Sequence, residues 1–231
     1  MNLKKTSLLT LKWIFICALV GILSGSASAL FLVSLEWVAQ IREHNIWIVW
    51  LLPIGGLLIG LSYYYWGNEV VKGNNLLLEE YENPQKTIPL KMVPLVFLGT
   101  IITHLFGGSA GREGTAVQMG GAIADQFTGF LKLNNSDRRT LIILGISAGF
   151  ASVFGTPLAG ALFALEVLYF SKINFKSIAL SFLVAYVAYF TVEFWHVKHT
   201  HYHIPIVPEI TSKILIWVIL VSIIFGIASM L

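Results

Sequence analysis

Apolar runs dominate this chain, and the polar connectors between them are short. The runs cover residues 11–40, 46–66, 90–107, 113–130, 140–170, 175–195 and 213–231. Several of them approach the roughly 20 residues that an α-helix needs to cross the hydrocarbon core of a bilayer. The first run is too long for the apolar part of a signal peptide, so we expect a retained first span. The pattern predicts an all-α, multi-pass membrane protein.

Composition supports this prediction and excludes several other classes of protein. Hydrophobic residues make up 56% of the chain and charged residues only 12%, which is typical of a membrane protein. The net charge is +3 and the basic residues are scattered, so no basic stripe exists for a nucleic-acid partner. A single cysteine, Cys17, excludes a disulfide framework and a cysteine metal site. We expect no metal and no cofactor.

The charges between the runs indicate the orientation in the membrane. Lysines lie before the first run and after the second, at Lys4, Lys5, Lys72, Lys86 and Lys91. Because cytoplasmic loops carry an excess of basic residues, we expect a cytoplasmic N-terminus. Lys132, Arg138 and Arg139 fit this scheme less cleanly. We expect the protein to lie in the plasma membrane. Acidic residues at the edges of the runs are expected to be solvated: Glu36, Glu69, Glu79, Glu80 and Glu193.

Four glycines interrupt the pattern in the middle of the chain, at Gly107, Gly108, Gly111 and Gly114. They predict a helix that ends and restarts, and such a break at membrane depth is tolerated only where it is buried in protein or lines a cavity. The free N–H groups of the restarting helix favour an anion. Glu113 can occupy that place as a carboxylate and release it when protonated, which is a gate. Alternatively, Glu113 only caps the helix while Arg112 snorkels.

A second break and a helix start are expected elsewhere. Residues 147–166 hold Gly149, Pro157 and Gly160 within an apolar run, and small residues of this kind let helices approach closely, so we assign them to helix packing. Residues 72–80 place Asn74 and Asn75 just ahead of an apolar triplet. Amide N–H donors at a helix start can also face an anion.

The three stretches together resemble motifs of the CLC family of anion channels and proton-coupled anion transporters. The motifs are Gly73–Leu77, then Gly111–Thr115 with Val117, Gln118 and Gly120, and then Ala148–Glu166. The resemblance implies two inverted repeats of tilted and broken helices, with an anion path through each subunit of a homodimer. It also implies an anion-binding and gating site made of Gly73, Asn74, Asn75, Gly111, Arg112, Glu113, Gly114 and Thr115.

Three departures from the chloride-type motifs refine what the resemblance implies. Asn74 replaces the anion-facing serine, and Thr115 replaces the proline after the gating motif. Val167 replaces the second of two glutamates that relay protons in chloride/proton exchangers. The first two changes resemble the fluoride-exporting bacterial branch, which implies fluoride export coupled to protons, with Glu113 as the titrating group. A chloride channel or chloride/proton exchanger of the same family stays the alternative.

The same resemblance implies that half of the anion path is missing. The family's second repeat supplies further helix N-termini, whereas this chain stops within the run 213–231. We therefore expect residues 1–231 to form a single membrane domain that is the N-terminal half of a transporter, as a fragment or a truncated gene product. A non-transporting remnant is the alternative.

An enzyme is the rival class. Residues Gly107–Gly111 spell GGSAG, which satisfies the nucleophile-elbow pattern G-x-S-x-G, with His104 nearby, so an intramembrane serine hydrolase is conceivable. The elbow needs a strand before the serine, and the preceding run is helix-like. We expect that the protein is not an enzyme.

A histidine cluster follows the run 175–195. It consists of His196, His199, His201 and His203, and alternating histidines in a loop can hold a divalent metal. We favour an aromatic-rich loop at the membrane interface.

Overall fold

The computed structural model describes residues 3–168, 175–199, 207 and 209–230, and helices are the only regular secondary structure in these ranges. The expected all-α fold is confirmed. The elements in chain order are α1 (Leu3–His44), the short 3₁₀ helix η1 (Ile46–Leu51), α2 (Leu52–Trp66), α3 (Asn74–Glu82), α4 (Met92–Leu105), α5 (Arg112–Phe130), α6 (Asn135–Phe154), α7 (Pro157–Val167), α8 (Phe175–Phe194) and α9 (Ser212–Ala228).

The chain forms two compact units, Met1–His199 and Thr200–Leu231. In the second unit, no residue of α9 is buried. Its start is capped by the Thr211 hydroxyl, which accepts a hydrogen bond from the N–H of Ile214 at 3.4 Å. The expectation of one domain over residues 1–231 stays a prediction, and the site described below lies within the first unit.

Three helical segments in the described ranges are long and apolar enough to cross a membrane: Leu8–His44, Ile46–Trp66 and Phe175–Phe194. The second of them is almost entirely exposed, and within α2 only Gly55 is buried. Large apolar side chains such as Leu57 and Leu58 face outward there. Exposing so much apolar surface to water is unfavourable, whereas the hydrocarbon core of a bilayer is itself apolar.

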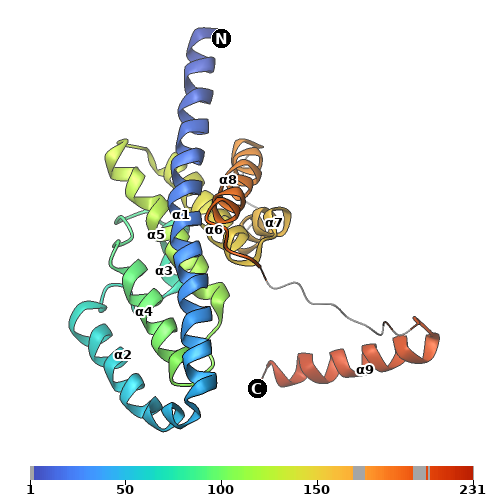
Figure 1. The fold of residues 1–231 in the computed structure, drawn as a ribbon. Coiled ribbons are helices and arrows are strands. Elements are labelled where there is room, and N and C mark those ends of the chain that lie inside the picture. The colour runs from blue at the N-terminus through green and yellow to red at the C-terminus, as the bar shows by residue number, and fades with distance from the viewer. Residues whose placement is uncertain (1–2, 169–174, 200–206, 208, 231) are drawn as a thin grey trace. The chain divides into compact units, whose positions relative to one another are not determined.

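Helix α6 lies at the centre of the first unit and packs against α1, α5, α7 and α8 (Figure 1). Glycines allow the closest of these approaches. A Cβ atom on Gly120 of α5 would overlap the carbonyl oxygen of Gly145 on α6, and one on Gly149 would overlap that of Ala116. On α7, a Cβ on Gly160 would stand 2.7 Å from the Ala151 side chain of α6. The α5–α6 pair is therefore in backbone contact.

We expect Gly149→Ala to lower the stability of the helix bundle by about 1–3 kcal/mol, because the new methyl group forces α5 and α6 apart. Thermal unfolding in detergent measures the effect. Gly129→Ala is the matched control, since a Cβ at Gly129 of α5 meets nothing within 4 Å. An unchanged melting temperature for Gly149→Ala would contradict the close packing.

Both expected helix breaks are confirmed. Helix α4 ends at Leu105 and α5 begins at Arg112. The apolar run 140–170 is divided between two helices, because α6 ends at Phe154 and its C-cap residue Gly155 adopts a left-handed φ of 68°. Helix α7 then opens on Pro157, and proline suits the first turn of a helix because its missing N–H has no partner there.

Candidate functional site

The loop between α4 and α5 turns sharply at a glycine. Gly107 has a φ of 78°, and a Cβ there would stand 2.9 Å from the Val49 side chain. A larger residue would therefore be strained and crowded. The N–H of Gly108 donates to the Thr103 carbonyl at 2.8 Å, which closes the end of α4. The chain then runs extended through Gly111, the N-cap residue of α5. Because glycine has no side chain, it offers no capping hydrogen bond to the first turn of the helix.

The start of α3 meets the start of α5. The amide nitrogen Nδ2 of Asn74 lies 3.3 Å from the position that a Cβ on Gly114 would take. In return, Nε2 of Gln118 lies 3.4 Å from the corresponding position on Gly73, which has a φ of 56°. The two glycines keep this approach close, so two helix N-termini and two amide side chains converge.

A cavity of about 80 Å³ opens at this junction. Its walls come from α3, α5, α6 and α7 and are mostly apolar, and they are formed by Asn74, Leu77, Leu78, Glu113, Gly114, Val117, Ile146, Phe163 and Val167. Asn74 and Glu113 supply its polar side chains, and both stand in the first turn of a helix. The N–H groups of such turns carry partial positive charge. The arrangement is suited to a small anion.

Glu113 lies over the first turn of α5. Its Oε2 atom is 2.7 Å from the position that a Cβ on Gly111 would take, so the carboxylate turns back toward the start of the helix. This is the place that a free anion would also favour. Arg112 and Glu113 are both exposed, but only Glu113 lines the cavity. The geometry agrees with both interpretations of Glu113, as a gate and as a cap.

Thr115 points away from the cavity. Its side chain is buried, and its hydroxyl lies 2.7 Å from the hydroxyl of Thr100 on α4. Thr100 donates its own hydroxyl hydrogen to the Val96 carbonyl at 2.8 Å. In the contact between the two hydroxyls, Thr115 is therefore the donor and Thr100 the acceptor. Thr115 therefore joins α4 to α5 behind the site.

The structure adds residues that the sequence did not single out as site residues. Leu77, Ile146 and Phe163 line the cavity, and Gln118 reaches Gly73. Leu77, Gln118 and Phe163 lie within the three motifs, whereas Ile146 had no sequence signal. Val167 also lines the cavity with its apolar side chain, whereas Asn75 does not line it.

The two remaining sequence features have different outcomes. The GGSAG segment follows helix α4, so it lacks the strand on which a nucleophile elbow is built. In the histidine cluster, His201 and His203 lie outside the described residues. The ring of His199 packs at Gly155, 2.6 Å from the position of a Cβ there.

These features define an all-helical integral membrane protein in which two helix N-termini meet at a cavity between broken helices. Residues 55–231 match the sequence profile of the family described as voltage gated chloride channel, and the chain belongs to that family. A chloride/fluoride channel protein of Pseudomonas syringae pv. tomato is 49% identical over 220 residues, which are 95% of this chain and 49% of the relative. An H(+)/Cl(-) exchange transporter ClcA of Cronobacter sakazakii is 30% identical over 167 residues, 66% of this chain and 36% of the relative.

Comparison with solved structures gives the same family. The crystal structure of a CLC-type fluoride/proton antiporter superimposes with a TM-score of 0.84 at 31% identity, over 98% of this chain and 56% of that one. A slow cyanobacterial Cl-/H+ antiporter shares the fold, with a TM-score of 0.65 at 22% identity, over 80% of this chain and 47% of that one. The expected CLC fold is confirmed. The chain spans about half the length of these relatives.

Proposed function

We propose that this chain forms the N-terminal half of the anion path of a fluoride exporter that exchanges fluoride for protons. The observation that carries the proposal is the cavity at which Asn74 of α3 meets Glu113 and Gly114 of α5. Two relatives support the choice of ion, one named a chloride/fluoride channel protein and one a fluoride/proton antiporter.

The chemistry of the cavity suits fluoride. Fluoride is small and holds its water tightly, so a selective site must replace that water with several close donors. The Asn74 amide and the N–H groups of two helix starts are such donors. The Glu113 carboxylate competes with fluoride for the positive potential of these N–H groups. Protonation of Glu113 therefore frees the site for fluoride and couples proton movement to fluoride movement.

Val167 argues against chloride/proton exchange of the ordinary kind. This residue faces the cavity with an apolar side chain that can neither bind nor release a proton. Glu166, its neighbour, is exposed and does not line the cavity. Glu113 is therefore the acid of this cavity that we assign to proton exchange.

The same proposal includes the setting of the protein. We propose a homodimer in the plasma membrane, with the N-terminus in the cytoplasm. The lysines that flank the first two spans support this orientation, and the three membrane-length helices support the multi-pass arrangement.

The test compares the chain alone with a chimera in which the remaining part of the Pseudomonas syringae relative follows residue 231. We expect the purified 231-residue chain to move no fluoride across liposomes, because the path needs donors from both halves. The chimera is expected to release fluoride and to take up protons. Ion-selective electrodes for fluoride and protons measure both.

Three outcomes would contradict the proposal. Robust fluoride efflux from the chain alone would show that no second half is needed. A chimera that folds but prefers chloride would reassign the protein to the chloride branch of the family. A folded chimera without any anion flux would indicate a non-transporting remnant.

A further inference from the structure

Arg138, at the start of α6, is buried between two carboxylates. Its side chain is 5% exposed, that of Asp125 on α5 is fully buried, and that of Glu80 on α3 is 12% exposed. Arg138 forms a bidentate ion pair with Asp125, in which Nε donates to Oδ1 and Nη2 donates to Oδ2, each at 2.8 Å. Its Nη1 donates to Oε2 of Glu80 at 2.9 Å. One side chain thus joins three helices.

This corrects the expectation that Glu80 is solvated. Glu80 turns inward because Arg138 offers it a buried partner, and unpaired charge is costly inside a protein. The other acidic residues of that group are exposed as expected: Glu36, Glu69, Glu79 and Glu193.

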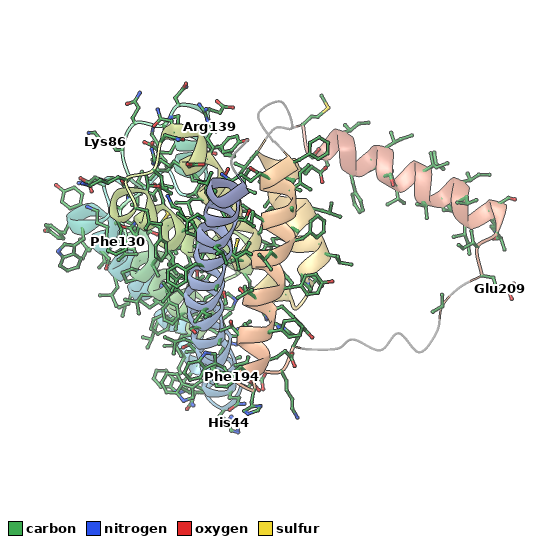
Figure 2. All side chains as sticks on the ribbon, turned by 90° about the horizontal axis from the view of Figure 1, so that it is seen from above. His44, Lys86, Phe130, Arg139, Phe194 and Glu209 are labelled. Carbon is green, nitrogen blue, oxygen red and sulfur yellow. The ribbon has the colours of Figure 1, made fainter. Side chains whose placement is uncertain are left out.

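The same network holds the connector 83–89 in place. Glu80 accepts hydrogen bonds from the backbone N–H groups of Gln85, at 2.8 Å, and Lys86, at 3.1 Å. Asp125 accepts one from the N–H of Ile88 at 2.7 Å, and Arg138 donates to the Lys86 carbonyl. Figure 2 shows Lys86 and Arg139 close together at one edge of the first unit. The end of α3 and the chain after it are therefore fixed by directional contacts.

The next residue of α6 binds the end of α3 directly. Arg139 donates from Nε to the Tyr81 carbonyl at 2.8 Å and from Nη2 to the Glu82 carbonyl at 3.0 Å. The last carbonyls of a helix have no partner within it, and a cation near them is favourable. Two adjacent arginines thus secure the last turn of α3.

All three helices joined by Arg138 also wall the cavity, through Asn74 of α3, Glu113 of α5 and Ile146 of α6. Counted at 1.5 Å per residue, Glu80 lies about 9 Å along α3 from Asn74, and Asp125 about 18 Å along α5 from Glu113. A helix as short as α3 does not hold its shape in isolation. Its direction depends on these contacts and on Leu77, which packs against Gly121 of α5.

We infer that Arg138 is a positioning residue for the anion site: by binding Glu80 and Asp125 it aims the N-terminus of α3 at the N-terminus of α5. Apolar residues can often replace a buried ion pair without loss of stability. Apolar contacts, however, are not directional, so they do not fix the angle at which a helix lies as the hydrogen-bonded ion pairs of Arg138 do. The inference rests on the proposed function, because the site it positions is the proposed anion site.

The first test measures the placement of α3 in the 231-residue chain itself. Arg138→Lys keeps the charge but loses the two-pronged geometry, and we expect the amides of residues 76–82 to exchange hydrogen about tenfold faster. Lys176→Gln is the matched control, since Lys176 pairs with Asp137 of α6 at 2.9 Å without touching α3. Exchange in the control is expected to match the unmutated chain.

A second variant covers the case in which Arg138→Lys does not fold. Glu80→Leu removes the link from Arg138 to α3, together with the hydrogen bonds that Glu80 accepts from Gln85 and Lys86. It leaves the ion pair of Asp125 and Arg138 in place, so the same faster exchange is expected. Native exchange rates in α3 for the folded variants would overturn the inference.

The second test separates positioning from stability. In the chimera, we expect Arg138→Lys and Glu80→Leu to lower the ratio of fluoride to chloride efflux by about threefold or more. A residue that only stabilised the protein would lower both fluxes together and leave the ratio unchanged, which would overturn the inference. If the unmutated chimera carries no fluoride, the proposed function fails, while hydrogen exchange still decides the placement of α3.

Discussion

Replacing Glu113 by glutamine is expected to abolish fluoride-driven proton movement in the chimera. Glutamine keeps the size and shape of a protonated glutamate, but it can neither take up nor release a proton. Because Glu113 lines the cavity and lies over the first turn of α5, it is the group that we assign to proton exchange. Proton flux should fall to the background of empty liposomes, while fluoride still crosses without coupling.

Paired recordings of pH and fluoride from the same liposomes measure this result. Glu79→Gln is the matched control: Glu79 lies on α3 but does not line the cavity, and it pairs with Lys72 at 2.6 Å. Coupling should survive that change. Persistent proton flux in Glu113→Gln would show that another acid carries the proton, and an inactive variant with native folding would favour the role of Glu113 as a helix cap.

Local chemistry made the helix breaks predictable from the sequence. Gly107 adopts a positive φ that glycine tolerates best, and Gly155 does the same before Pro157 opens α7. Asn74 begins α3 directly after Gly73. Each of these signals acts within a few residues, so it can be read from a short stretch of sequence.

The contacts across the site could not be predicted in this way. Asn74 meets Gly114 from forty positions away in the chain, and no periodic pattern encodes that approach. Thr115 illustrates the limit: its place in the motif pointed to the anion, whereas its hydroxyl binds Thr100 on the neighbouring helix. Which side of α5 faces the cavity depends on how α3, α4 and α6 pack around it.

Buried charge was the least predictable feature. Arg138 and Glu80 stand in polar, connector-like sequence, and such residues are usually solvated. Their burial follows from the return of connector 83–89 to the start of α6, where backbone N–H groups and Asp125 complete the network. The sequence predicted a solvated Glu80 and did not place Arg138 cleanly, because no pattern in the sequence pairs charges that lie so far apart in the chain.

The double change Asn74→Ser with Thr115→Pro is expected to lower the ratio of fluoride to chloride efflux in the chimera by about tenfold, which is about 1.4 kcal/mol of differential stabilisation. Asn74 brings an amide donor to the wall of the cavity, and serine offers one shorter hydroxyl in its place. Fewer close donors penalise fluoride more than chloride, because fluoride loses the more strongly held water. Thr115→Pro removes the hydroxyl bound to Thr100 and the N–H of the fourth residue of α5, so it loosens the start of that helix.

The single variants divide the effect between the two residues. Since Asn74 lines the cavity and Thr115 does not, we expect Asn74→Ser to carry most of the change, with Thr115→Pro acting through the position of Gly114. Asn75→Ser is the matched control, because Asn75 is the neighbour of Asn74 but does not line the cavity, so its replacement should leave the ratio unchanged. Fluoride and chloride efflux are measured from the same liposomes, so that differences in reconstitution cancel. A native ratio in the double variant would place selectivity outside these two residues, in the part of the path that the second half of the chimera supplies.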